Sequence, residues 1–309
     1  MIKCKRIQNN TRALKSERKD DKDDKPIKTP FEKTRDDFEQ EFCGEIVELL
    51  IFTLQNVTGA ASLKDGCKMP SVHFEASVNV ATQDFSEREG RLEWVLTPEE
   101  FEEKRWGFSF EPYKIHHIKC QKRPFMELEP YMSEVANNCY HLLEYLDDQS
   151  SDSRLETLIE TYQKPVIIRD DIGEFTLNRA YSWFEGFITY DGGKIHAIFA
   201  ASADESLPPS SFDDLKKFMG TFQVQDTRIK DYIVKELWET AQDWIDSDEN
   251  DVELTEEYFT NSLSLSELSI NEDGELTLYY DDSEEIFAGH AIEVVIDKEG
   301  EILRADLVG

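Results

Sequence analysis

Residues 182–201 read SWFEGFITYDGGKIHAIFAA, and this stretch decides the fold of the second half of the chain. Two strand-like runs, Ser182 to Tyr190 and Lys194 to Ala201, flank the turn Asp191-Gly192-Gly193. The glycines can adopt the positive φ angles that tight hairpin turns require. The stretch therefore predicts a β-hairpin, and with it an antiparallel sheet.

The elements expected around this hairpin follow one another along the chain as strands, then helices, then strands. Helices are expected from Ser210 or Ser211 to about Phe222 and from about Asp226 to Ile245, and a short helix capped by Thr255 follows. Two further hairpins are expected at the turns Glu272-Asp273-Gly274 and Lys298-Glu299-Gly300. The pattern predicts an α+β domain of mainly antiparallel sheet with packed helices. The four strands of these hairpins are expected near 265–271, 275–280, 290–297 and 301–307, and the buried face of the long helix at Ile229, Ile233, Leu237, Ala241 and Trp244.

The first half of the chain predicts a second domain of the same class. Apolar residues three and four apart, from Phe38 to Leu50, predict a first helix. Helix starts are expected at Thr97, which begins a capping box, and at Asp152. Four strands are expected at 73–80, 91–96, 113–120 and 139–146. We therefore expect a disordered basic tail at 1–30, an N-terminal α+β domain at 31–164 and a C-terminal α+β domain at 165–309.

The charge of the chain is strongly negative and unevenly distributed. The formal net charge is −32; residues 1–30 carry +5, and residues 231–309 carry −21, with 24 acidic and three basic residues. Such a surface repels phosphate backbones and anionic lipid headgroups, so nucleic acid and membranes are not expected as partners. A basic protein, a polyamine or a metal cation would be attracted to it.

The sequence also predicts a cytoplasmic location. The N-terminus lacks the apolar segment of a secretory signal, and no run approaches the length of a membrane span. Five cysteines without CxxC spacing are typical of reduced thiols.

Three stretches of the second half resemble a known bacterial family. They are GEFTLNRAYSWFEGFI at 173–188, LWETAQDW at 237–244, and LYYDD at 278–282 together with Gly289-His290. Over about residues 166–309 the chain is similar to the family called domain of unknown function 2262, and the preceding region resembles the uncharacterised module that often precedes it. The resemblance implies a bacterial origin and a shared fold. It implies no activity and no catalytic residues.

An acidic segment between two expected helices matches the spacing of a calcium-binding loop. Oxygen-bearing side chains occupy the first, third, fifth and twelfth places at Asp246, Asp248, Asn250 and Glu257. Asp251 stands where such a loop needs glycine. The alternative interpretation is an acidic linker followed by the N-cap Thr255 and a helix.

Histidines offer two further hypotheses. His290 follows Gly289 close to Asp281 and Asp282, so it is a candidate general base of a hydrolase-like or metal-dependent enzyme. The alternative is a strand-end histidine that is hydrogen-bonded within a hairpin. His116 with Cys120 and Cys139 with His141 share strand faces in pairs, which is compatible with zinc but equally with buried sheet residues.

The sequence thus favours a non-enzymatic, acidic protein-binding module, either of the immunity type or an adaptor, with a basic protein as partner. Phosphate-binding glycine loops, GxSxG and HExxH are absent from it. An enzyme centred on His290 and a calcium-binding loop at 246–257 are the alternatives.

Overall fold

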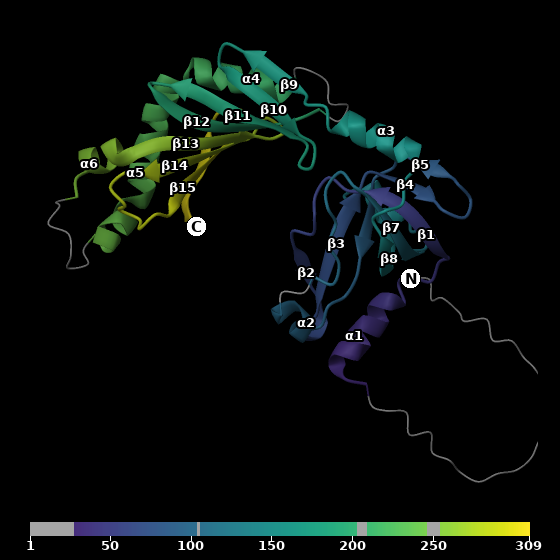
Figure 1. Ribbon diagram of the computed structural model, residues 1–309. Coiled ribbons are helices and arrows are strands. Elements are labelled where there is room, and N and C mark those ends of the chain that lie inside the picture. Colours follow the sequence, from purple (N-terminus) through teal and green to yellow (C-terminus); the bar gives the residue numbers. More distant parts are fainter. Residues whose placement is uncertain (1–27, 104–105, 203–208, 246–253) are drawn as a thin grey trace, which may run out of the picture. The chain divides into compact units, whose positions relative to one another are not determined.

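A computed structural model describes residues 28–103, 106–202, 209–245 and 254–309 (Figure 1). The chain divides into two compact units, with the division between Lys164 and Pro165. Each unit has its own eight-stranded sheet, and helices pack on both units' sheets. The predicted α+β class with mainly antiparallel sheets is therefore confirmed. The expected disordered tail, residues 1–30, lies almost wholly outside the described residues, and helix α1 begins at Pro30.

The N-terminal sheet closes on itself. Strands β3 and β4 are one bent strand interrupted at Glu75; β3 pairs with β6, while β4 pairs with β1. The circuit continues through β8 and β7 back to β1, and only the β6–β8 pair is parallel. The strand bounds are β1 Ile46–Phe52, β2 Ala60–Ser62, β3 Lys68–Phe74, β4 Ala76–Asn79, β5 Phe85–Ser86, β6 Gly90–Glu93, β7 Ile115–Lys122 and β8 Cys139–Asp147.

This strand order is that of an OB-fold, a five-stranded Greek-key barrel. Counting β3 and β4 as one strand, the order around the barrel is first, second, third, fifth, fourth. Helix α2 (Pro98–Glu102) follows the third barrel strand, and α3 (Ser153–Tyr162) follows the fifth. Short β2 and β5 extend the sheet beyond the barrel circuit.

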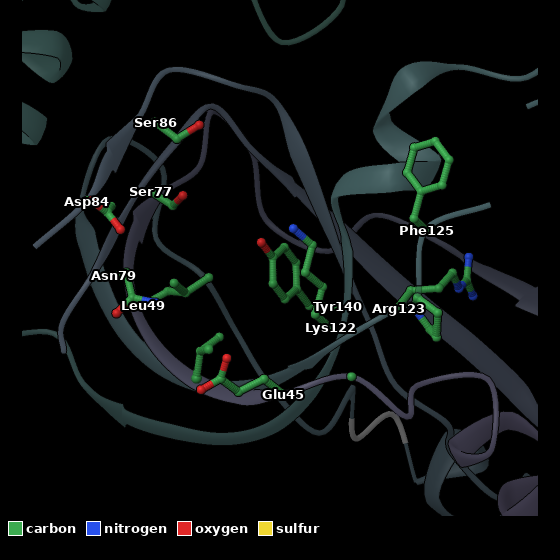
Figure 2. Close-up of a pocket in the computed structure, with 13 residues that line it drawn as sticks. Glu45, Leu49, Ser77, Asn79, Asp84, Ser86, Lys122, Arg123, Phe125 and Tyr140 are labelled. Atoms are coloured by element: carbon green, nitrogen blue, oxygen red, sulfur yellow. The ribbon is translucent and has the colours of Figure 1, made fainter. Parts of the chain in front are cut away.

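Alternating side chains fill the barrel. The interior residues are apolar and nearly all less than a tenth exposed, as a strand period of two requires when one face is buried. Figure 2 shows Leu49 and Tyr140 surrounded by the curving strands. This core comprises Leu49, Ile51, Val72, Phe74, Leu92, Trp94, Leu96, Phe110, Ile118, Cys120, Tyr140 and Leu142.

Helix α1 (Pro30–Glu39) contributes to a second, smaller core. Phe38, with Phe42 just after the helix, packs on Cys67, Val95 and Cys139. The predicted continuation of this helix to Leu50 is wrong, because residues 46–52 form β1. The run IVELLIF pairs with a strand on each side, and that long-range pairing overrides the helical spacing of its apolar residues.

The C-terminal sheet is two four-stranded meanders joined through helices. Its order is β16-β15-β14-β13-β12-β11-β10-β9, and only the central β12–β13 pair is parallel. The bounds are β9 Ile167–Asp170, β10 Gly173–Asn178, β11 Trp183–Tyr190, β12 Gly193–Ala200, α4 Ser210–Gly220, α5 Phe222–Ile245, α6 Glu256–Ser262, β13 Leu263–Ile270, β14 Leu276–Asp282, β15 Ala291–Ile296 and β16 Ile302–Val308.

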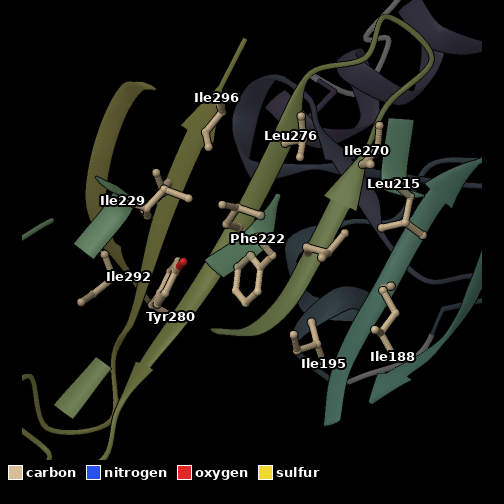
Figure 3. Close-up of a cluster of buried hydrophobic side chains, with 14 of the residues drawn as sticks. Ile188, Ile195, Leu215, Phe222, Ile229, Ile270, Leu276, Tyr280, Ile292 and Ile296 are labelled. Atoms are coloured by element: carbon tan, nitrogen blue, oxygen red, sulfur yellow. The ribbon is translucent and has the colours of Figure 1, made fainter. Parts of the chain in front are cut away.

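The helices pack on one face of this sheet. Figure 3 shows Leu215 of α4 and Phe222 and Ile229 of α5 against apolar side chains of the strands. Within this core the hydroxyl of Tyr280 donates to Asp226 of α5 at 2.8 Å. Burial raises the pKa of the Tyr280 hydroxyl, and so does the neighbouring Asp226 carboxylate.

Most local predictions of hairpin turns and helix starts are confirmed. The hairpin at 183–200 turns at Asp191 and Gly192, which both have positive φ. Thr97, Asp152 and Thr255 cap helices as expected. Helix α5 begins earlier than predicted, at Phe222, and Trp244 is 39% exposed, whereas it was expected on the buried face.

Three of the cysteines, Cys67, Cys120 and Cys139, are buried free thiols. Cys43 is disulfide-bonded, so the expectation of five reduced thiols is wrong for this residue. Within the described ranges, no helix has the length and apolar character needed to cross a membrane.

Candidate functional site

One face of the C-terminal sheet is not covered by α4, α5 or α6, and we call it the open face. Along β10, β12 and β14, buried residues alternate with exposed or half-buried ones. The buried set belongs to the core beneath the helices. This alternation is typical of an antiparallel sheet with one solvated face.

A single row of side chains crosses the open face at right angles to the strands. The pairing register aligns one residue from each strand, so neighbours in the row lie about 4.8 Å apart along the hydrogen-bonding direction. We call these eight residues the open-face row. They are Arg169, Glu174, Phe187, His196, Glu267, Tyr279, Glu293 and Asp306.

The centre of the row holds a histidine–carboxylate pair. Nδ1 of His196 lies 2.7 Å from a carboxylate oxygen of Glu267, across the parallel β12–β13 pair. The ring of His196 also contacts the ring of Phe187, with centroids 5.2 Å apart. Phe187 is 56% exposed, which is unusual for a large apolar side chain.

The C-terminal half of the row is held by ionic hydrogen bonds. The Tyr279 hydroxyl donates to Glu293 at 3.1 Å. Arg304 donates to Glu293 at 2.5 Å and to Asp306 at 2.9 Å. Burial raises the pKa of the Tyr279 hydroxyl, with a further increase from Glu293. The tyrosine therefore remains a neutral donor at physiological pH.

A second aromatic group lies at the other half of the open face. The indole Nε1 of Trp183 donates to Glu185 at 3.1 Å, and the Asn178 amide donates to the other oxygen of the same carboxylate at 3.1 Å. Tyr181, which is 51% exposed, stacks on Trp183 with ring centroids 4.6 Å apart. Aromatic rings are thus fixed beside carboxylates.

This arrangement is better suited to binding cations than to catalysis in a site closed off from water. Carboxylates and the faces of aromatic rings both attract ammonium and guanidinium groups. The side chains of His196 and Glu267 are 30% and 36% exposed, so water has access to the pair. A general base in an enzyme is usually shielded and oriented by a further group.

The structure places the ring of His290 in contact with Trp244 and Gly309. This half-buried ring packs edge-on against Trp244, with centroids 5.4 Å apart. Both oxygens of Asp282 accept backbone N–H groups, from Glu284, Ile286 and Phe287, so this carboxylate holds the turn before β15. Asp281 is exposed at the end of β14.

The calcium-loop candidates Asp246, Asp248 and Asn250 lie outside the described residues. Glu257, the fourth, lies in the first turn of α6 behind the N-cap Thr255, as the alternative interpretation expected. Among the described residues, no group of three or more His, Cys, Asp or Glu could hold a metal ion.

The zinc candidates His116, Cys120 and Cys139 are buried in the barrel domain. His116 is 1% exposed, and its two ring nitrogens lie 2.9 Å from the Tyr145 hydroxyl and 2.9 Å from the Glu111 carbonyl. Burial raises the pKa of the Cys120 thiol, and raises that of Cys139 to about 11. Without a metal, both thiols therefore stay protonated at neutral pH.

The open-face row was missed in the sequence because its members come from eight separate strands. The available signal was period-two polarity, for example the half-buried or exposed positions 194, 196 and 198 of β12 beside buried Ile195 and Ala197. That signal assigns a residue to a face. It does not give the register that brings His196 beside Glu267.

Two family models match the chain, one for each compact unit. Residues 169–307 match a family described as an uncharacterized protein conserved in bacteria, domain of unknown function 2262. Residues 34–162 match domain of unknown function 7021. The C-terminal domain therefore matches the bacterial family that the sequence resembles, and a module of a different family precedes it. Comparison with curated proteins and with solved structures finds no match.

Proposed function

We propose that this protein is a non-enzymatic binding module whose C-terminal domain engages a basic protein partner through the open face. The observation that carries the proposal is the open-face row, in which four carboxylates lie among two aromatic side chains, a histidine and an arginine across the eight strands. An immunity-type protein and an adaptor would both use such a surface.

Charge supports a basic partner. Residues 165–309 contain 34 acidic and ten basic residues, a net charge of −24. A field of this sign speeds the approach of a cationic surface and slows that of an anionic one. The partner would then be held by short-range contacts rather than by net charge alone.

The local chemistry supports arginine and lysine as the groups that bind. The carboxylate of Glu174 is 56% exposed and that of Glu267 is 36% exposed, so each can accept a further hydrogen bond from a guanidinium. Phe187 already has the ammonium of Lys194 over its ring at 5.7 Å. A partner's cation would make the same kind of contact with an exposed ring.

The enzymatic alternative has less support. His290 packs against Trp244, and Asp282 is engaged by backbone N–H groups. His196 and Glu267 form a close pair, but they lie on an open sheet face. We therefore assign these residues to recognition and not to catalysis.

The proposal can be tested with a defined probe, a synthetic peptide of about twelve residues that alternates arginine with valine. Its cationic side would face the sheet if it lies extended across the strands. Binding is measured by calorimetry at low and at physiological salt, where the screening length falls to about 8 Å. We expect saturable binding that weakens with salt. The triple variant Glu174→Gln, Glu267→Gln, Glu293→Gln should weaken it about tenfold or more.

The matched control removes the same number of charges from hairpin turns, in Glu272→Gln, Asp273→Asn and Glu299→Gln. It should retain the affinity of the wild type within about twofold. Equal losses in both triple variants would show that only net charge matters. No binding even at low salt would count against the proposal.

A further inference from the structure

The mouth of the N-terminal barrel forms a cavity of about 450 Å³. It lies where β1 and β8 begin and where β4 and β7 end, and it is lined by residues from all four strands and from β5. Barrel mouths are common positions for small-molecule sites, and this volume is within the usual range for them. Figure 2 looks into the cavity.

The cavity has an apolar floor and a polar wall. Val47, Leu49 and the ring of Tyr140 form the floor, which is continuous with the barrel core. Ser77 and Ser86 contribute hydroxyl groups to the wall opposite Tyr140 and Lys122 (Figure 2). A ligand that fits this cavity therefore needs an apolar body and groups that form hydrogen bonds.

Charges of both signs stand around the cavity, and among the described residues three of them form no ion pairs. The ammonium of Lys122 lies 5.6 Å from the centroid of the Tyr140 ring. Asp84 accepts a hydrogen bond from Thr82 at 2.6 Å, and Glu45 is exposed. Across the described ranges, none of Lys122, Asp84 and Glu45 belongs to an ion pair, whereas Arg123 is held by Glu41 and Glu93.

The rim carries an aromatic side chain in a fixed loop. Phe125 lines the cavity and is 80% exposed. The loop beyond it is held by Asn137, whose amide accepts from Met126 N–H at 3.0 Å and donates to Met126 C=O at 3.1 Å. A ligand in the mouth can bury this ring without the cost of ordering the loop.

We propose that the barrel mouth binds a small zwitterion with an apolar body, namely a free amino acid or a short peptide. The ligand carboxylate pairs with Lys122, the ligand ammonium pairs with Asp84 or Glu45, and the apolar side chain lies between Phe125 and the floor. A simple anion such as a phosphate would meet two carboxylates here, and a simple cation would meet Lys122. This site is in the N-terminal domain and the open face is in the C-terminal domain, so each proposal can be refuted without affecting the other.

The first test is calorimetric titration of the full chain with free L-phenylalanine and with its two charge-blocked forms, N-acetyl-L-phenylalanine and L-phenylalaninamide. We expect saturable binding of the free amino acid, with a Kd of about 1 mM or tighter. Each blocked form should bind about tenfold more weakly, because each lacks one of the two charge-assisted contacts. Equal binding of all three compounds would overturn the proposal.

Variants locate the site. Lys122→Met should weaken binding of L-phenylalanine about tenfold, and the double variant Glu45→Gln, Asp84→Asn should do the same. The matched control is Lys119→Met, on the same strand but on its opposite face, which should bind as the wild type does. Unfolding curves of each variant show whether it is folded. The absence of binding at about 10 mM to the wild type, or saturable binding of glucose or adenosine monophosphate in place of L-phenylalanine, would overturn the assignment.

Discussion

Glu93 is the charged side chain most deeply buried in the barrel domain, at 1% exposed among the described residues. It lies between two arginines: Arg91 is 2.6 Å away and Arg123 is 3.0 Å away. The guanidinium of Arg123 also pairs with Glu41 and lies 4.6 Å from the centroid of the Phe42 ring. This network therefore connects β6, the residue that follows β7 and the segment after α1.

We predict that Glu93→Gln destabilises the N-terminal domain by about 3–5 kcal/mol. The amide retains the shape of the side chain but removes its charge, which leaves two guanidinium groups near each other without their shared partner. Their Nε atoms are already buried without acceptors. By contrast, replacing the whole triad by Arg91→Met, Glu93→Leu and Arg123→Met should cost less than the single change, because the desolvation of all three charges is then avoided.

Native-state hydrogen exchange, read by mass spectrometry on peptides from residues 46–147, reports the stability of this domain alone. Glu134→Gln, in the same domain, is the matched control, since its carboxylate is 89% exposed and its partner Arg88 is 65% exposed. Its cost should be below about 1 kcal/mol. If Glu93→Gln costs no more than Glu134→Gln, or if the apolar triple variant costs more than Glu93→Gln, the reasoning is wrong.

Three further predictions concern single groups. The Cys139 thiol, with its pKa raised to about 11 by burial, should react with iodoacetamide at neutral pH far more slowly in the native protein than in urea. Hydrogen bonds from Ser150 lower the pKa of Asp147 to about 2. The contribution of Asp147 to folding stability is therefore present above about pH 3.8 and is lost as the pH falls through about 2. Asp147→Asn should make the free energy of unfolding less dependent on pH between these two values. If residues 246–257 form a calcium loop, chelator-treated protein should bind about one equivalent of calcium in a calorimetric titration, and Asp246→Ala or Glu257→Ala should abolish that binding. If the wild type binds no calcium, the acidic-linker interpretation remains.

Local features of the fold were predictable from sequence because their causes are local. The turn at Asp191 and Gly192 needs positive φ at adjacent residues, and the caps at Thr97 and Asp152 need a side-chain oxygen at a helix start. Neighbouring residues determine both. The sequence therefore identified these elements with nearly correct bounds.

Barrel closure was not predictable in the same way. Residues 46–52 have the apolar spacing of a helix, and they become a strand because β4 and β7 pair with them from 24 or more residues away. The bend at Glu75, where its N–H donates to the Phe52 carbonyl, lets one strand serve both sides of the barrel. Nothing in the local pattern around residue 75 specifies that partner.

For the candidate site, too, the sequence indicated what depends on neighbouring residues but not what depends on long-range strand pairing. Proximity in sequence suggested His290 with Asp281 and Asp282, yet the fold turns the Asp282 carboxylate to backbone N–H groups. On the open face, a close histidine–carboxylate pair is instead formed by His196 with Glu267, which are 71 residues apart. Sheet register brings such groups together, and register is a property of the whole fold.

The most direct test of the proposed function is carboxyl footprinting of the full chain with and without the alternating arginine–valine peptide. A water-soluble carbodiimide and an amine modify accessible carboxylates, and mass spectrometry then gives the labelling of each one. The account predicts that the peptide protects Glu174, Glu267 and Asp306 on the open face but leaves Glu272 and Glu299 in the hairpin turns unchanged. Protection spread evenly over the acidic surface, or confined to the turns, would contradict the claim that the open face is the binding site.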